Sequence, residues 1–324
     1  MPGKRSFEQQ LAALDEVRHL TPEAAVEPLR KALTHRNNYI VGKAADLTAK
    51  FRLVQLLPEL LAAFDRFFTD PLKTDPQCWA KNALSRALAA LGCQDVDVFL
   101  RGMRHFQPEP VWGGSEDTAG TLRGTCVLAL VQCRSLPETE LLRCLMELLV
   151  DKDKSVRVET ARAIEQVGSS SAALLLRLRV ILASDEPEVL GTCYGGILRI
   201  EGASAMTWIA RFLAGADETA AEAAWAIADQ RSAPAFTVLR ERFAVERDAW
   251  FRSVLLSAIA LTRQQEALDF LFQLIRTEPL NAEAAVTALV ESKPSPEVLK
   301  QVEELVRDNP RLARIFEGRQ KGHA

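Results

Sequence analysis

The chain has 324 residues, with 40 lysine and arginine residues against 43 aspartate and glutamate residues, so its formal net charge is -3 and its isoelectric point is about 6.0. This balance gives no overall attraction for nucleic acid or anionic lipid and disfavours a dedicated polyanion-binding protein. A hydrophobic fraction of 48% and a charged fraction of 26% exclude a disordered or fibrous chain, and the abundance of alanine and leucine beside only 6% aromatic residues favours helices.

The first segment, MPGKRSFEQQLAALDEV, has two basic residues but no uninterrupted apolar run, so we predict an amphipathic helix at about residues 7–20 rather than a secretion signal. The most apolar internal run, from Ala172 to Ala183, contains Arg177 and Arg179 and is far shorter than the roughly 20 residues of a membrane span. We therefore expect a soluble, cytoplasmic protein without a membrane partner. The six cysteines form no CxxC pair and are expected to be reduced core residues.

Helix pairs repeat along most of the chain. The clearest copy is residues 140–168, ELLRCLMELLVDKDKSVRVETARAIEQVG, in which two segments with apolar residues at the period of a helix are joined by a short polar turn. Asp153 is suited to cap the second helix, and Gly168 is suited to end it. Similar pairs recur with a period of roughly 31 to 34 residues, and they give eight pairs over about residues 22–292.

Prolines in this pattern stand at the predicted starts of helices rather than inside them. The examples are Thr21-Pro22, Leu136-Pro137, Ala233-Pro234 and Ser295-Pro296. Two further helices, at about residues 7–20 and 296–318, are predicted to cap the ends of the stack. The sequence therefore predicts an all-α protein in which residues 1–324 form a single domain of stacked antiparallel helix pairs.

These copies resemble HEAT repeats, which are antiparallel helix pairs with an acidic residue in the turn and a Val-Arg step at the start of the second helix. The resemblance covers about residues 25–292 and is sharpest at Asp151, Val156, Arg157 and Ala161. It implies a right-handed α-solenoid. HEAT-like proteins include scaffolds, transport adaptors, chromophore-lyase subunits and a divergent branch of DNA glycosylases, so the resemblance implies an architecture and does not select a function.

One charge spacing recurs across the repeats: a polar or acidic residue in the turn is followed six positions later by a cation. The pairs are Asn37 and Lys43, Asp75 and Lys81, Asp117 and Arg123, Asp151 and Arg157, and Glu246 and Arg252. In HEAT repeats the equivalent residues form a ladder, in which the acid of one repeat bonds the base of the next and so aligns the two repeats. The alternative is that the cations line the concave face and bind an acidic partner.

The charge spacing breaks at Asp185, which is followed six positions later by Gly191. The segment GTCYGG that starts at Gly191 places three glycines inside a predicted helix, at a cost of about 1 kcal/mol each relative to alanine. One interpretation is close packing against the neighbouring helices. The other is that the missing side chains open a hollow on the inner surface for a ligand or peptide, with Tyr194 at its edge.

The longest stretch without helical periodicity is residues 107–120, QPEPVWGGSEDTAG, between the two helices of the third pair. Loops inserted on one face of a solenoid are often binding elements. Trp112 is a candidate anchor beside Glu116 and Asp117, a composition that suits a partner with some basic character. The alternative is that Trp112 folds back over its own helices, with an aspartate as a cap. No Gly-Lys-Ser/Thr follows the glycines, so no phosphate-binding loop is predicted.

The histidines are scattered and the sequence has no metal-ligand or nucleophile motif, so we predict no metal, no cofactor and no catalytic residue. We expect a non-enzymatic scaffold or adaptor that binds another protein through its concave face and the third-repeat loop. The alternative is an enzyme or enzyme accessory of a HEAT-like type, either a chromophore-lyase-like subunit or a DNA glycosylase. The basic, aromatic groove that a glycosylase needs is indicated only faintly by Trp79, Trp112 and Trp250.

Overall fold

The computed structural model describes residues 2–321, with side chains over residues 7–320. In this part of the chain the protein is all-α apart from one two-stranded hairpin. Its contacts divide the chain into two compact units, one up to Val167 and one from Gly168 onward. A single domain over residues 1–324 stays a prediction.

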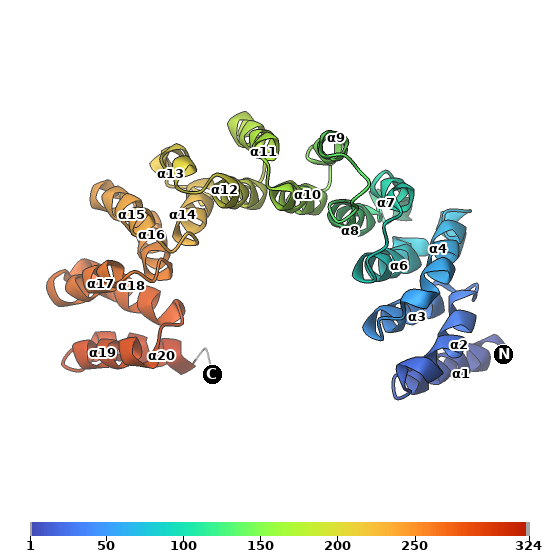
Figure 1. The fold of residues 1–324 in the computed structure, drawn as a ribbon. Coiled ribbons are helices and arrows are strands. Elements are labelled where there is room, and N and C mark those ends of the chain that lie inside the picture. Colours follow the sequence, from blue (N-terminus) through green and yellow to red (C-terminus); the bar gives the residue numbers. More distant parts are fainter. Residues whose placement is uncertain (1, 322–324) are drawn as a thin grey trace. The chain divides into compact units, whose positions relative to one another are not determined.

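The first unit, over residues 2–167, contains one N-terminal helix followed by four helix pairs. The N-terminal helix is α1 (Pro2–Val17), and the pairs are α2 (Pro22–Leu33) with α3 (Asn38–Lys50), α4 (Leu57–Arg66) with α6 (Trp79–Ala90), α7 (Val96–Met103) with α8 (Gly120–Leu130), and α9 (Glu138–Leu148) with α10 (Lys154–Val167). Short helices in the connections are η1 (Val54–Leu56), α5 (Pro71–Thr74) and η2 (Pro76–Cys78). The second helices pack on one another in series from α3 to α10, and in this unit they form a layer beside the first helices (Figure 1).

The second unit, over residues 168–321, contains five helix pairs. They are α11 (Ser170–Leu182) with α12 (Pro187–Glu201), α13 (Ala203–Ala210) with α14 (Glu218–Ala228), α15 (Ala233–Val245) with α16 (Ala249–Leu261), α17 (Gln265–Thr277) with α18 (Pro279–Glu291), and α19 (Pro296–Val306) with α20 (Pro310–Lys321). A short helix, η3 (Arg211–Ala214), extends α13. The second helices again pack in series, from α12 to α20. The prediction of an all-α protein made of stacked helix pairs is confirmed.

Both terminal helices differ from their predicted bounds. The C-terminal cap predicted as one helix at residues 296–318 is two helices, because Pro310 cannot continue a helix and Asn309 caps α20 by accepting two backbone amides. The N-terminal helix begins at Pro2 instead of residue 7 and ends at Val17. The C-terminal end of the stack is therefore a complete helix pair.

The segment expected to be an irregular loop forms a β-hairpin between α7 and α8. Strand β1 (Pro108–Val111) pairs with strand β2 (Gly114–Asp117) in antiparallel register. The turn consists of Trp112 and Gly113, and Gly113 has a φ of 93°, which glycine adopts at little cost. The hairpin is therefore a regular, hydrogen-bonded element inserted between the two helices of the third pair.

Apolar side chains from the two helix layers form the core of each unit. Large buried examples in the first unit are Phe64, Leu84 and Phe99, which are all inaccessible to solvent. The six cysteines are free and buried, as the sequence predicts. Burial raises the pKa of the Cys78 thiol to about 11, so this thiol stays protonated at neutral pH. None of the described helices combines the length and the apolar character that crossing a bilayer requires.

The glycine-rich part of α12 is closely packed, as the first of the two interpretations expects, and the alternative that places Tyr194 at the edge of a hollow is wrong. Tyr194 is only 1% exposed, and its ring centroid lies 5.2 Å from that of Phe212. A Cβ atom on Gly191 would overlap the carboxylate of Glu222 on α14, and one on Gly195 would press on the side chain of Arg199. The glycines therefore make room for neighbouring side chains, which offsets their cost to the helix.

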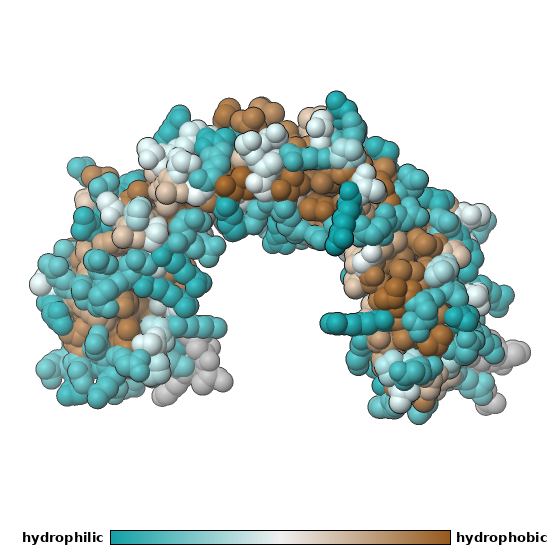
Figure 2. All heavy atoms as spheres, in the orientation of Figure 1, coloured by the Kyte–Doolittle hydropathy of each residue, from teal (hydrophilic) through white to brown (hydrophobic). Residues whose placement is uncertain are grey.

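One helix of the second unit carries an exposed apolar face. Leu174, Leu178, Ile181 and Leu182 share one side of α11, and each is more than half exposed. Figure 2 shows the resulting apolar surface over this helix. In the described part of the chain nothing covers this face.

Candidate functional site

Arg123 joins two neighbouring helix pairs of the first unit. Its side chain is 1% exposed and donates to Asp117 at 2.6 Å and to both carboxylate oxygens of Asp151, at 2.8 and 3.0 Å. It also donates to the backbone carbonyl of His105 at 3.1 Å. Asp151 belongs to the turn of the following pair, so here the acid of one pair bonds the base of the preceding pair, which is the reverse of the predicted direction.

Lys81 and Asp75 form a fully buried ion pair within the second helix pair. Their charged atoms, Nζ and Oδ2, lie 3.0 Å apart, and neither side chain has exposed surface. Asp75 also accepts from the backbone amides of Ala80 and Lys81 and from the Asn38 side chain of the preceding pair. This acid and base are therefore bonded within one helix pair, whereas the predicted ladder bonds an acid to the base of the next pair. Asp75 links its pair to the one before it through Asn38.

The first-unit cations Arg157 and Lys43 have different surroundings. Arg157 is buried and donates to the backbone carbonyls of Asp151 and Lys152. Lys43 lies over the ring of Tyr39, 5.6 Å from its centroid, whereas Asn37 caps α3 and has no bond to Lys43 in the described part of the chain. Since Lys81, Arg123 and Arg157 are all buried, these three cannot serve as an exposed cationic row for an acidic partner.

In the second unit the turn acids bond cations that precede them. The Glu246 carboxylate pairs with Arg242 of the preceding helix, and Arg252 instead donates to the Glu246 backbone carbonyl at 2.8 Å and to Asn281 of the next pair at 3.2 Å. Asp185, where the predicted spacing breaks, pairs with a cation of α11 in the same way. Asp185 therefore bonds Arg179 on the helix before the turn, in place of a cation at position 191 on the helix after it.

Glu109 and Gln107 fasten the base of the hairpin to the rest of the unit. The Glu109 carboxylate accepts from the Gln77 amide, from the Gln107 side chain at 2.7 Å and from the Thr118 hydroxyl at 2.8 Å. The Gln107 side chain also donates to the Asp75 backbone carbonyl at 2.9 Å. These bonds hold the hairpin in one orientation relative to the turn before α6.

Trp112 lies at the tip of this fastened hairpin and is fully exposed. The alternative that it folds back over its own helices is therefore wrong. Glu116 is also exposed, but Asp117 is half-buried and accepts from the backbone amides of Gln107 and Ala119 at 2.9 and 3.1 Å, in addition to its bond with Arg123. Of the three residues predicted in this loop, Trp112 and Glu116 face solvent, and Asp117 holds the hairpin in place.

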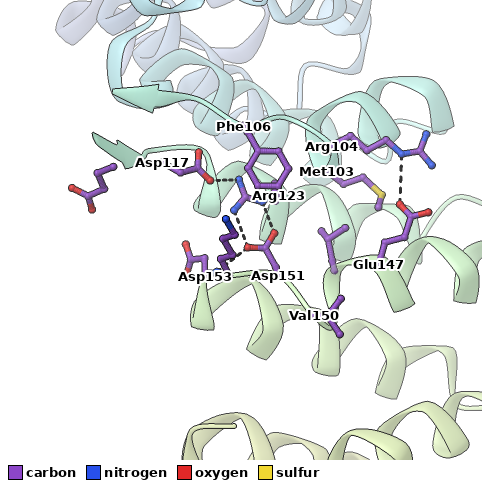
Figure 3. A pocket seen from close by; sticks show the side chains of 12 residues that line it. Met103, Arg104, Phe106, Asp117, Arg123, Glu147, Val150, Asp151 and Asp153 are labelled. Carbon is purple, nitrogen blue, oxygen red and sulfur yellow. Dashed lines mark hydrogen bonds and ion pairs between the residues drawn. The ribbon is translucent and has the colours of Figure 1, made fainter. Parts of the chain in front are cut away.

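A groove of about 810 Å³ lies between the hairpin and the next helix pair (Figure 3). Its lining residues are Met103, Arg104, Phe106, Glu116, Asp117, Arg123, Glu147, Leu148, Val150, Asp151, Lys152 and Asp153. Phe106 and Val150 are 58% and 65% exposed, and the Phe106 ring lies 4.2 Å from the Arg123 guanidinium carbon. The groove therefore combines apolar surface with a charged rim next to β2 of the hairpin.

Three half-buried titratable groups at the base of the hairpin have shifted pKa values. Burial alone would raise the pKa of Asp117, but its bonds to two backbone amides and to Arg123 lower it below its usual value. The same balance of burial against hydrogen bonds lowers the pKa of Glu109. Burial, aided by the nearby cations Lys81 and Arg123, lowers the pKa of His105 despite its bond to Gln107. At neutral pH these groups are two carboxylates and a neutral imidazole.

The stability of the protein should fall as the pH falls, in two steps. A lowered pKa in the folded state means that the unfolded chain binds more protons, so stability is lost below about pH 6.5 through His105 and below about pH 4 through Asp117 and Glu109. Urea denaturation between pH 7.5 and 3 measures this loss. In the Asp117→Asn variant the free energy of unfolding should fall less steeply below about pH 4. An unchanged fall would contradict the role assigned to Asp117.

Several of the site residues cannot be recognised from the sequence. Met103, Phe106, Glu147 and Val150 line one groove but come from two helix pairs, and neither pair alone has an unusual pattern. Gln107 and Glu109 looked like ordinary loop residues. The described residues contain no group of three or more histidine, cysteine or carboxylate side chains able to hold a metal ion.

Comparisons with known proteins add little to this geometry. No protein-family model and no curated protein matches the chain. A solved structure of an engineered protein is similar over 97% of this chain and 95% of its own, at 18% sequence identity and a TM-score of 0.38. At these values we draw no conclusion from the likeness.

Proposed function

We propose that this chain is a non-enzymatic scaffold or adaptor that binds another protein at the hairpin and the adjacent groove. The observation that carries the proposal is the fully exposed Trp112 at the tip of a hairpin whose base is fixed by buried hydrogen bonds. A rigid exposed aromatic loses little conformational entropy on binding, and such residues are frequent hot spots. The HEAT likeness of the helix pairs supports a binding role and remains part of the proposal.

The proposal also includes a cytoplasmic location. Its support is the set of six buried, free cysteines, which suits a compartment that keeps thiols reduced. The second-helix layer of each unit, which corresponds to the concave face of a HEAT-like stack, is a further contact surface for the partner in this proposal.

Replacing Trp112 by alanine should weaken partner binding at least tenfold, or about 1.4 kcal/mol, and change the free energy of unfolding by less than about 0.5 kcal/mol. Loss of an exposed anchor removes contact area in the complex but no contact in the free protein. The measurement is quantitative capture from lysate of the source organism, with urea denaturation of the same variant.

Leu280→Ala is the matched control, because Leu280 is a large apolar residue that is 97% exposed at the start of α18, in the other unit. The Leu280→Ala variant should capture every protein that the wild type captures from the lysate. The proposal fails if no retained protein depends on Trp112, or if both variants lose the same proteins equally.

A further inference from the structure

The register of the hairpin determines which backbone groups are already used. In an antiparallel ladder hydrogen-bonded and non-bonded pairs alternate, and the pair that closes a two-residue turn is a bonded one. The bonded pairs are then Val111 with Gly114 and Glu109 with Glu116. The Thr118 amide does donate to the Gln107 carbonyl, at 3.0 Å, which fits this alternation at the far end of the hairpin.

The remaining residues form the two outer edges of the hairpin, and only one edge has donors. On β1 the outward residues are Pro108 and Pro110, which have no N–H, so this edge is blocked to strand pairing. On β2 they are Ser115 and Asp117, whose N–H and C=O groups point away from β1. In the described part of the chain these four backbone groups have no hydrogen-bond partner.

The free edge of β2 borders the groove. The two hairpin residues that line the groove, Glu116 and Asp117, both belong to β2. In Figure 3 Asp117 lies on the hairpin, and Asp153 lies on the facing turn before α10. Since β1 covers the other edge of β2, an extended chain paired with Ser115 and Asp117 would lie along the groove.

The groove also has a chemical preference. Five carboxylates line it against three cations, and Arg123 is the cation bound to both Asp117 and Asp151. Glu116 is exposed and has no ion pair among the described residues. The apolar surface beside these charges is Phe106 and Val150. The excess of carboxylates complements a cationic side chain, and the apolar surface complements a large aliphatic or aromatic one.

We infer that the free edge of β2 binds an extended segment of the partner protein as a third strand. The segment carries a lysine or arginine that faces Glu116 and a large apolar residue that covers Phe106 and Val150. Main-chain bonds to Ser115 and Asp117 supply affinity, and the alternating side chains supply specificity. This inference rests on the proposed function, because it describes how the partner is held at the same site.

The test uses phage-displayed random peptides of about 12 residues, selected on the full chain, as the probe. Dissociation constants of enriched peptides are then measured by fluorescence anisotropy. Ser115→Pro removes the outward N–H without removing a ladder bond, and it should weaken binding at least tenfold. Ser115→Ala removes the hydroxyl and keeps the N–H, so its affinity should stay within twofold of wild type. Enriched peptides should share a cationic residue and a large apolar one.

Amide hydrogen exchange of the wild-type protein gives a second readout that does not depend on the folding of a variant. Exchange at Ser115 and Asp117 should slow when an enriched peptide is bound. Unchanged exchange at both residues, or equal affinities of Ser115→Pro and Ser115→Ala, would overturn strand addition.

The outcomes separate this inference from the proposed function. If peptide binding depends on Trp112 but not on the Ser115 amide, strand addition is wrong and the binding role stands. If selection yields no peptide whose binding depends on the hairpin or groove, both are wrong. A dimer in light scattering that Ser115→Pro abolishes would make a second copy of this chain the occupant and would also overturn the inference.

Discussion

Replacing Arg123 by methionine should lower the free energy of unfolding by about 3 to 5 kcal/mol. The variant would leave Asp151 buried without its bidentate cation and would remove a bond to Asp117. Bonds to both carboxylates raise the pKa of Arg123 in spite of its burial, so the guanidinium is charged throughout the stable range. Urea denaturation followed by circular dichroism measures the loss.

The matched control is Arg86→Met, which removes a surface ion pair. Arg86 lies 3.5 Å from Asp46, and each of these side chains is 51% exposed. Exposed pairs contribute less than about 1 kcal/mol, so this variant should unfold close to the wild type. Equal losses in the two variants would contradict the role of Arg123 as a buried link between helix pairs.

Replacing Tyr194 by alanine should also destabilise the protein, by about 3 to 5 kcal/mol. Its ring is buried in the second unit and packs on Phe212, so truncation leaves a cavity. The expected result is a lower urea midpoint.

Tyr194→Phe keeps the ring and should lose much less stability than Tyr194→Ala. A Tyr194→Ala variant as stable as the wild type would instead favour the other interpretation of the sequence, in which Tyr194 lies at the edge of a binding hollow. The two variants therefore distinguish packing from a binding role at the glycine-rich part of α12.

The helix pairs could be predicted because each one buries a stripe of apolar residues at the helical period. The copy at residues 140–168 also carries its turn and cap residues in the predicted places, with Asp153 accepting the Ser155 amide and Gly168 at a φ of 72°. Such local signals need no knowledge of neighbouring repeats. The extra C-terminal helix was missed although Asn309 and Pro310 marked its start.

The hairpin was not predicted because its strands are short and proline-rich. Prolines usually argue against a strand, and here Pro108 and Pro110 are tolerated because both stand on the outer edge of β1. Only the register, which depends on the turn at Trp112 and Gly113, distinguishes an edge position from a ladder position. The sequence left two alternatives open for Trp112, and the exposed one is observed.

The ion pairs show where spacing along the sequence stops being informative. Asp75 with Lys81, and Asp117 with Arg123, are bonded within their own helix pairs, whereas the ladder expected from the sequence bonds an acid to the base of the next repeat. The spacing also did not indicate Arg242, which lies four residues before Glu246 and bonds its carboxylate. The cation that bonds a turn acid is therefore not determined by sequence separation alone.

Photo-crosslinking in cells of the source organism tests the binding role of the hairpin most directly. A benzophenone-bearing phenylalanine analogue is placed at position 112 in one variant and at position 280 in another, since Trp112 and Leu280 are both highly exposed. If the hairpin binds a partner, a discrete crosslinked protein forms from position 112 and is absent from position 280. The same adducts from both positions, or none from position 112, would contradict it.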